Sequence, residues 1–192
     1  MKRILLTALT VCGVMSAQAD LFQYAVTLDG ASESPANASL GTGIGSVNYD
    51  DAAHTLQLQV SFTNLTGTVT ISHIHAPTPS PFSGIAGVAT TTPSFAGFPA
   101  GDTFGSYSNT LDLTLSTSWN GSFITANGGT TAGAESALAA AMASGEAYWN
   151  IHSSVFGGGE IRGFLVAVPE PSSLALLGLG TVALAWRMRR RS

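Results

Sequence analysis

The chain has 192 residues, of which 45% are hydrophobic, so it is long enough to bury the core of one domain. Its net charge of −4 is unevenly distributed, because residues 20–167 contain ten acidic residues and only one basic residue, Arg162, and therefore carry a charge of −9. A surface with one cation cannot neutralise a phosphate backbone, which excludes nucleic acids as partners and disfavours anionic lipids and sulfated glycans, whereas cations and neutral sugars stay compatible.

Residues 1–19 have the organisation of a signal peptide. A charged start precedes an apolar run over residues 4–15, and Ala17 and Ala19 provide the small side chains that signal peptidase requires. The apolar run is shorter than the ~20 residues that a membrane-spanning helix needs. We therefore predict cleavage after Ala19 and export, and the only cysteine, Cys12, leaves with this segment.

Alternation of apolar and polar residues dominates the chain from residue 20 onward. It is clearest over residues 22–28, 56–62 and 111–115, and turn residues such as those at 64–67 separate the runs. This pattern is typical of antiparallel strands with one buried and one solvated face. Because such strands must bury their apolar faces against each other, we predict an all-β fold, an antiparallel β-sandwich over residues 20–167.

Two segments depart from the alternation. Residues 134–143 are rich in alanine, Leu138 and Met142 are four residues apart, and Gly145 follows as a stop signal, so we predict one short helix there. Residues 77–101 are rich in proline, serine, threonine and glycine. They are expected to form a long loop with room for one edge strand.

Three of the four histidines lie on predicted strands. Strand alternation over residues 69–75 places His73 and His75 on the apolar face of one strand, and His152 lies on a later strand. The fourth histidine, His54, is near two aspartates just before a strand. We expect it to be a solvated turn residue.

The three strand histidines allow two interpretations. A His-x-His pair presents two nitrogens to one ion, and His152 would complete a set of three imidazoles suited to zinc or copper. Glu160 would then orient one imidazole or act as a fourth ligand. In the alternative, His73, His75 and His152 form a structural polar cluster, hydrogen-bonded to Asn150, Glu160 and backbone groups.

Arg162 and the two serines Ser153 and Ser154 bear on whether the protein is an enzyme. As the single cation of its segment, Arg162 is expected to pair bidentately with Glu160 or another acid and to pin the closing strand, with substrate binding as the alternative. The two serines after His152 lie outside any nucleophile-elbow context. A metal-bound water is the one catalytic mechanism that these residues could support. Because the sequence shows no other catalytic set, we predict a binding or structural module without enzyme activity.

Residues 168–192 contain three elements in a fixed order: Pro169-Glu170-Pro171, an apolar run over 174–186, and a terminal arginine cluster. As a helix the run rises about 20 Å, less than the ~30 Å hydrocarbon core, and its arginines would stay cytoplasmic. A plain single-span anchor is one interpretation. The three elements together resemble the PEP-CTERM sorting signal, which implies recognition by a membrane protease of the exosortase type and a Gram-negative host that makes exopolysaccharide.

A second resemblance covers residues 21–166. The opening residues 22–35, the His73-Ile-His75 strand, and the segments 145–152 and 158–163 resemble the CHRD (chordin-type) domain in order and spacing. That resemblance implies an extracellular β-sandwich module and no established activity.

These observations predict an exported module of the cell surface or extracellular matrix, for example a biofilm matrix. Its role would be structural or binding rather than catalytic, with signal peptidase, an exosortase-type protease and a neutral polysaccharide as partners, and with at least transient membrane anchoring by the hydrophobic helix of the tail. The alternative is a metal-binding protein or metalloenzyme that uses His73, His75 and His152.

Overall fold

The computed structural model describes residues 21–169, which fold mainly into β-strands. Eight strands form one antiparallel sheet in the order β4-β6-β7-β1-β2-β3-β5, with β8 paired to β1. The strands are β1 (Leu21–Asp29), β2 (Thr42–Asp50), β3 (Thr55–Thr63), β4 (Val69–His75), β5 (Gly105–Asp112), β6 (Tyr148–Ser153), β7 (Ile161–Phe164) and β8 (Val166–Ala167). The helices are the 3₁₀ turn η1 (Ser116–Ser118), α1 (Gly121–Ala126) and α2 (Thr131–Ser144).

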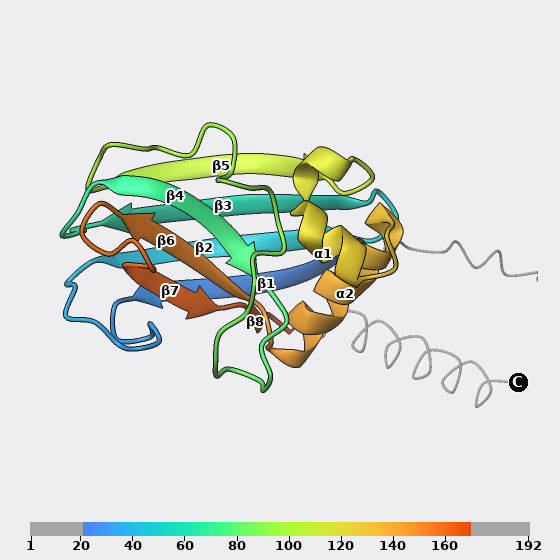
Figure 1. Cartoon of the computed structure of the whole chain (residues 1–192), viewed down its shortest axis with the longest axis horizontal. Helices are drawn as coiled ribbons and strands as arrows, with labels where there is room; N and C mark the ends of the chain where they lie inside the picture. Colours follow the sequence, from blue (N-terminus) through green and yellow to red (C-terminus); the bar gives the residue numbers. More distant parts are fainter. Residues whose placement is uncertain (1–20, 170–192) are drawn as a thin grey trace, which may run out of the picture.

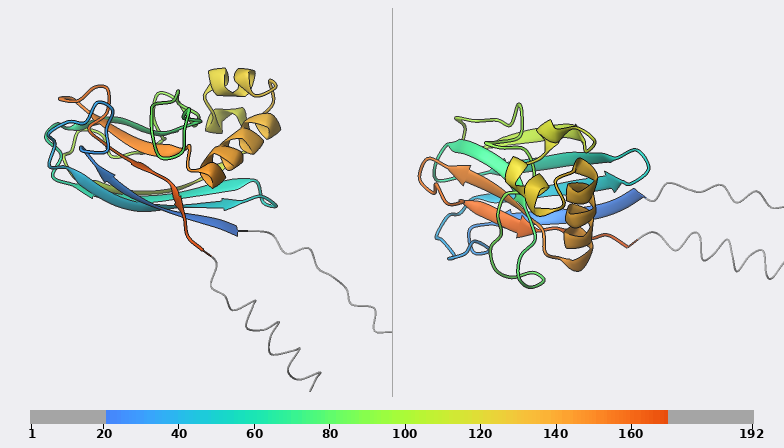
Figure 2. Two further views of the ribbon diagram at one scale, coloured as in Figure 1. Left: turned by 90° about the horizontal axis from the view of Figure 1, so that it is seen from below. Right: turned by 45° about the vertical axis from the view of Figure 1, so that its right-hand side comes forward.

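The sheet curls into a half-barrel, so that its two halves face each other (Figure 1). β4, β6 and β7 form one layer, and β1, β2, β3 and β5 form the other. Helices α1 and α2 lie at one end of the space between the layers (Figure 2). The predicted antiparallel all-β fold is confirmed, and its two facing layers are parts of a single curled sheet.

The core is built from the apolar positions of alternating strands. In β3, Leu56 and Leu58 are fully buried, whereas Gln57 between them is exposed. The facing layer contributes Trp149, which is also fully buried and whose indole N–H donates to the hydroxyl of Ser72, 2.8 Å away. The indole of this fully buried tryptophan therefore has its polar atom satisfied, as burial requires.

The alternation predicted over residues 111–115 ends earlier than expected. β5 stops at Asp112, whose carboxylate accepts hydrogen bonds from the backbone N–H and the hydroxyl of Thr114. This local turn leads into η1, so Leu113 is still buried but Leu115 is 52% exposed. The prediction of a strand beyond Asp112 was wrong because a side-chain-capped turn replaces the ladder there.

β4 contains a bulge that changes which residues share a face. Val69 pairs with Ser153, but Ile71 pairs with His152, so one residue of β4 is extra between these two pairs. Val69 therefore joins the core at 3% exposure, and the residues after the bulge reverse their alternation relative to it. The prediction that His73 and His75 continue the apolar face of Val69 was wrong, because these imidazoles lie on the opposite, outward face.

Helix α2 confirms the predicted short helix and extends it at both ends. The side chain of Thr130 caps its N-terminus by accepting from the Gly133 N–H, and Gly145 ends it in the left-handed conformation with φ of 73°. Helix α1 was not predicted. It has six residues, begins at a glycine and offers no periodic apolar stripe, although Phe123 is buried.

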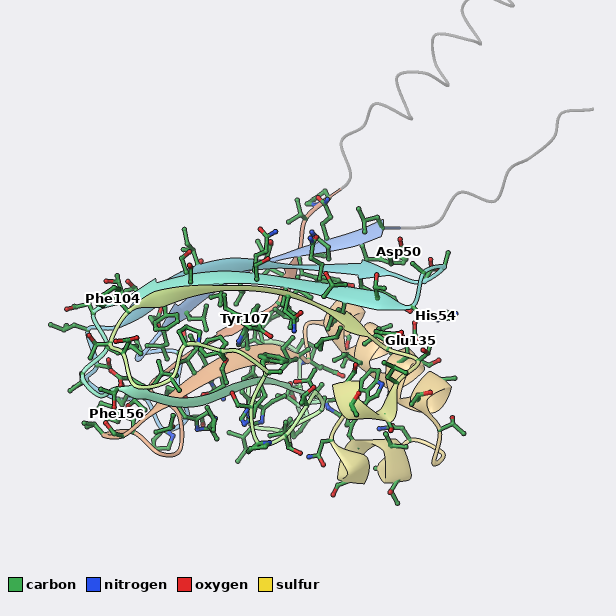
Figure 3. The ribbon with its side chains drawn as sticks, turned by 90° about the horizontal axis from the view of Figure 1, so that it is seen from above. Asp50, His54, Phe104, Tyr107, Glu135 and Phe156 are labelled. Atoms are coloured by element: carbon green, nitrogen blue, oxygen red, sulfur yellow. The ribbon has the colours of Figure 1, made fainter. Side chains whose placement is uncertain are left out.

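Glu135 of α2 links the helix to the β2–β3 hairpin (Figure 3). Its carboxylate accepts from the Tyr49 hydroxyl at 2.9 Å and lies 3.0 Å from Nδ1 of His54. The side chain of His54 is 52% exposed. The expectation that His54 is only a solvated turn residue was therefore incomplete, since it also contacts a buried acid.

The long segment 76–104 runs beside β4 and forms isolated β-bridges, such as that of Val88 with His75, rather than a continuous strand. Its backbone bonds intermittently to β4, as in Ala89 N to Ile74 O at 2.9 Å and Phe95 N to Ser72 O at 3.0 Å. Phe95 and Phe98 also enter the core, at 2% and 7% exposure. The segment thus covers an edge strand that would otherwise present unpaired backbone groups.

Glu160 holds together the end of the half-barrel that lies away from the helices. Its carboxylate accepts from the Ser39 hydroxyl at 2.5 Å and from the backbone N–H groups of Thr66 and Gly67. Burial alone would raise the pKa of Glu160, but these hydrogen bonds and one from the Ser153 hydroxyl outweigh burial and hold the pKa below its usual value. Glu160 contacts neither the histidines nor Arg162, contrary to expectation, because β7 begins only at Ile161 and Glu160 precedes its regular alternation.

We predict that Glu160→Gln lowers the free energy of unfolding by about 3 kcal/mol. Both carboxylate oxygens accept from backbone N–H groups, so an amide must place its NH₂ group against one of these donors. The midpoint of urea denaturation measures the change. Glu146→Gln is the matched control, and an equal effect of both variants would contradict this role of Glu160.

Candidate functional site

The outward face of the β4-β6-β7 layer is polar, although it is buried. Cross-strand pairs bring His73 opposite Asn150, and Asn150 opposite Arg162 of β7. Each of these three residues is at most 4% exposed. The core thus lies on one side of this layer, and loops cover a second buried surface on the other side.

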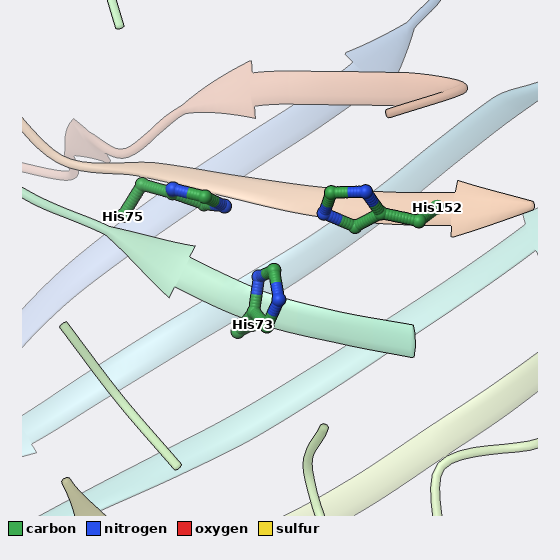
Figure 4. A group of neighbouring side chains, drawn as sticks. All are labelled: His73, His75 and His152. Carbon is green, nitrogen blue, oxygen red and sulfur yellow. The ribbon is translucent and has the colours of Figure 1, made fainter. Parts of the chain in front are cut away.

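His73, His75 and His152 meet on this face (Figure 4). One candidate ligand atom from each of the three lies within 4.8 Å of the others. The ring centroid of His73 is 4.8 Å from those of both His75 and His152, and the latter two are 6.2 Å apart. The three residues that the sequence predicted as one set are therefore brought together.

Two of the imidazoles have their tautomer fixed by backbone carbonyls. Nδ1 of His75 lies 2.8 Å from the carbonyl oxygen of Ala86, and Nδ1 of His152 lies 2.9 Å from that of Gly157. A carbonyl can only accept, so both Nδ1 atoms donate and carry the proton of the neutral ring. The Nε2 lone pairs of His75 and His152 are consequently free to accept.

Three buried nitrogen atoms of the cluster have no hydrogen-bond partner among the described residues. They are Nδ1 of His73, Nε2 of His75 and Nε2 of His152. Each buried polar atom that is left without a partner lowers the free energy of unfolding by about 1–3 kcal/mol. The cluster can accept hydrogen bonds or coordinate an ion through these nitrogens.

All three imidazoles are held neutral. Burial, with a smaller effect from the other two histidines, lowers the pKa of His73 to about 3. Burial lowers the pKa of His75 to about 4 in spite of its hydrogen bond to Ala86, and it also lowers the pKa of His152. Neutral imidazole is the form that accepts through nitrogen.

Arg162 fastens two loops onto this face. Its Nε donates to the carbonyl of Ser32, and one terminal nitrogen donates to the carbonyl of Gly84 at 3.0 Å. The guanidinium also lies 4.7 Å from the ring centroid of Tyr148, a cation–π contact. Arg162 also pairs with an acid, as expected, but the partner is Glu33 rather than Glu160: its Nε lies 3.9 Å from Oε2 of Glu33. The pair is not bidentate, because backbone carbonyls take the Nε and one terminal donor.

Glu33 is a part of the site that strand alternation did not identify. Its carboxylate accepts from the side-chain amide of Asn150 at 3.1 Å. Burial raises the pKa of Glu33 to about 7 against the opposing effects of Arg162 and its hydrogen bonds. Nothing in the period of the sequence marks Glu33, since it lies in a loop and is one of ten acids.

Gly159 allows the loops to close over Asn150. A Cβ atom at this position would lie 2.6 Å from Asn150 and 2.7 Å from Glu33, and its φ of 134° is accessible mainly to glycine. Beside it, a pocket of about 230 Å³ lies between residues 33–37 and residues 156–159.

The remaining predicted residues lie elsewhere. Pro169 is the last described residue and follows β8. Glu170, Pro171, Ala17 and Ala19 lie outside the described residues. Within the described part of the chain, no helix is both long enough and apolar enough to cross a membrane.

The described residues form an all-β domain whose single antiparallel sheet is curled and carries a buried polar outer face. Comparison with known families shows to which family of domains it belongs. The CHRD domain matches residues 24–165, so the chain belongs to the CHRD domain family. The PEP-CTERM protein-sorting motif matches residues 167–191. The two matches indicate an exported protein that is sorted by exosortase, a membrane enzyme. No curated protein and no solved structure matches the chain.

The pKa values predict that stability falls on the acid side. Because the folded histidines have pKa values below 6.5, the unfolded state binds more protons, so stability is full above about pH 6.5 and declines below it, by up to ~1.4 kcal/mol per pH unit for each histidine. Glu33 contributes to stability with the opposite dependence on pH, because its pKa is raised in the folded state. Its contribution is fully present below about pH 4.5 and is lost as the pH rises through about 7.

Melting temperatures between pH 5 and pH 7 measure this effect. Glu33→Gln removes the opposing contribution, so its melting temperature should fall more steeply with acid than that of the wild type. A flat profile of the Glu33→Gln variant from pH 7 to pH 5 would show that the three imidazoles do not titrate as buried neutral groups.

Proposed function

We propose that this protein is a non-catalytic CHRD module of the outer cell surface or extracellular matrix, delivered there by exosortase and bound to a neutral polysaccharide. The observation that carries the proposal is the exposed outer face of the β1-β2-β3-β5 layer, which has no charged side chain between its ends, where Asp29, Asp50 and Asp112 lie. Its side chains are mainly hydroxyls and amides, which bind neutral sugars by hydrogen bonds without ion pairs.

Part of this neutral face lies on β3 and the edge strand β5. Gln59 pairs with Ser108 across the two strands, and Gln57 pairs with Thr110. All four side chains are exposed. A charge of −9 on residues 20–167 is compatible with an uncharged polymer and unfavourable for an anionic one.

The burial of the reactive side chains supports a non-catalytic role. The three clustered histidines are at most 9% exposed, and Arg162 is engaged by backbone carbonyls and an aromatic ring. A substrate molecule could reach these groups only if the covering loops were displaced.

The ends of the domain suit attachment by one tail. Tyr24 of β1 pairs with Ala167 of β8, so both ends of the described chain leave at the same side (Figure 2). Attachment through the C-terminal residues would therefore hold the domain by this side.

We predict that sorting depends on the three residues of the motif. Replacing Pro169, Glu170 and Pro171 by alanine should prevent recognition by exosortase and retain the uncleaved chain in the membrane fraction. Immunoblots of membrane, outer-surface and matrix fractions measure this, with Ser172→Ala and Ser173→Ala as the control. Recovery of the alanine variant at the surface, at wild-type level, would refute sorting by this signal.

Charge placed on the neutral face should weaken binding to the polymer. We predict that Gln59→Glu combined with Ser108→Glu lowers co-sedimentation with the neutral exopolysaccharide of the host by at least ~10-fold, since the adjacent carboxylates demand hydration and repel each other. Ser136→Glu, on the exposed face of α2, adds the same kind of charge elsewhere and should leave binding unchanged. Wild-type protein that does not co-sediment would remove the polymer from the proposal.

A further inference from the structure

We propose that His73, His75 and His152 bind one transition-metal ion of the kind that prefers imidazole nitrogen, zinc or copper. The inference rests on the geometry of the outward face of β4 and β6 and is independent of the proposed function. The site would tie the two strands to the loops that cover them.

The geometry fits an ion with little rearrangement. The three candidate ligand atoms lie within 4.8 Å of one another. Around a tetrahedral ion with metal–nitrogen distances of about 2.0–2.1 Å, three imidazole nitrogens are about 3.4 Å apart. Small rotations of the rings that move each nitrogen by about 1 Å would therefore bring the three nitrogens to coordination distance from one ion.

A purely structural cluster leaves these histidines unsatisfied. The carbonyls of Ala86 and Gly157 take the N–H groups of His75 and His152, so both remaining Nε2 atoms are acceptors. Neutral His73 has a single N–H and can donate to only one of them. At least one buried lone pair stays without a donor from the cluster, whereas an ion uses all three lone pairs at once.

The backbone carbonyls have the role that supporting groups take in metal sites. A ligating histidine usually donates its second ring nitrogen to a carbonyl or carboxylate, which fixes the tautomer and the orientation of the ring. His75 does so to Ala86 in segment 76–104, and His152 does so to Gly157 in the loop before β7. An ion would thereby couple two loops that are distant in sequence.

Metal titration of the exported chain, purified with a tag that contains no histidine, tests the proposal. Zinc(II) and copper(I) are titrated separately in competition with a chromogenic chelator, which identifies the ion. We expect one ion per chain, a higher melting temperature with metal, and reversal by a chelator at pH 7.5. His73→Gln and His152→Gln should each weaken binding by at least ~10-fold, and His54→Gln, which changes the one histidine outside the cluster, should not.

A second measurement keeps the test valid if the buried variants do not fold. X-ray absorption of the loaded wild type should show three imidazole nitrogens at about 2.0 Å. Hydrogen exchange of the wild type should slow at residues 84–88 and 156–159 when metal is added. Fewer than one ion per ten chains with both metals, equal loss of binding in His54→Gln, or coordination without imidazole would each overturn the proposal, and none of these results depends on sorting or on polymer binding.

Discussion

The bulge between Val69 and Ile71 determines on which side of β4 the histidines lie. Before it, Val69 packs into the core, and after it Ser72 and Ile74 take the core positions at 0% exposure. His73 and His75 are consequently turned outward, away from Trp149 and towards the loops. Without the extra residue, the imidazoles would replace apolar side chains in the core, where no loop carbonyl could reach their Nδ1 atoms.

An outward polar face that is nevertheless buried needs its own hydrogen-bond partners. Three covering segments supply them: Ser32 and Glu33 come from the loop after β1, Gly84 and Ala86 from segment 76–104, and Gly157 from the loop before β7. Arg162 donates to two of these segments at once. The only basic side chain of residues 20–167 therefore lies buried and donates to backbone carbonyls of the covering loops instead of lying on the surface.

Strand alternation and capping residues were sufficient to predict much of the fold. The apolar positions of β1 and β3 and the C-terminal end of α2 follow from local patterns, since the strand period is two and Gly145 caps the helix. The N-terminal end of α2 lies three residues before the predicted one, at Thr131, with Thr130 as its cap. The bulge in β4 could not be predicted, because a single extra residue leaves no compositional trace. The same holds for the curl of the sheet, which depends on pairs such as Asp29 with Arg162 that are distant in sequence.

The candidate site was predictable where it depended on side chains of regular strands and not where it depended on loops. His73, His75 and His152 follow from strand positions, and their tautomers do not, because those depend on carbonyls whose position is set by the loop path. Glu160 shows the converse error. A spacing of two residues suggested a shared face with Arg162, but the strand begins only after Glu160 and its carboxylate serves a different end of the domain.

The histidine cluster and the neutral face belong to opposite layers of the half-barrel. The histidine cluster lies outside the β4-β6-β7 layer, and the neutral face lies outside the β1-β2-β3-β5 layer, with the core between them. A polymer on the neutral face would therefore not touch the loops that cover the histidines. An ion at the histidines would act on the stability of the module rather than on the polymer, since the groups that it orders, at Ala86 and Gly157, lie on the far side of the core from Gln59 and Ser108. Stability of this kind matters for a domain without cysteine in residues 20–167, which cannot be cross-linked by a disulfide.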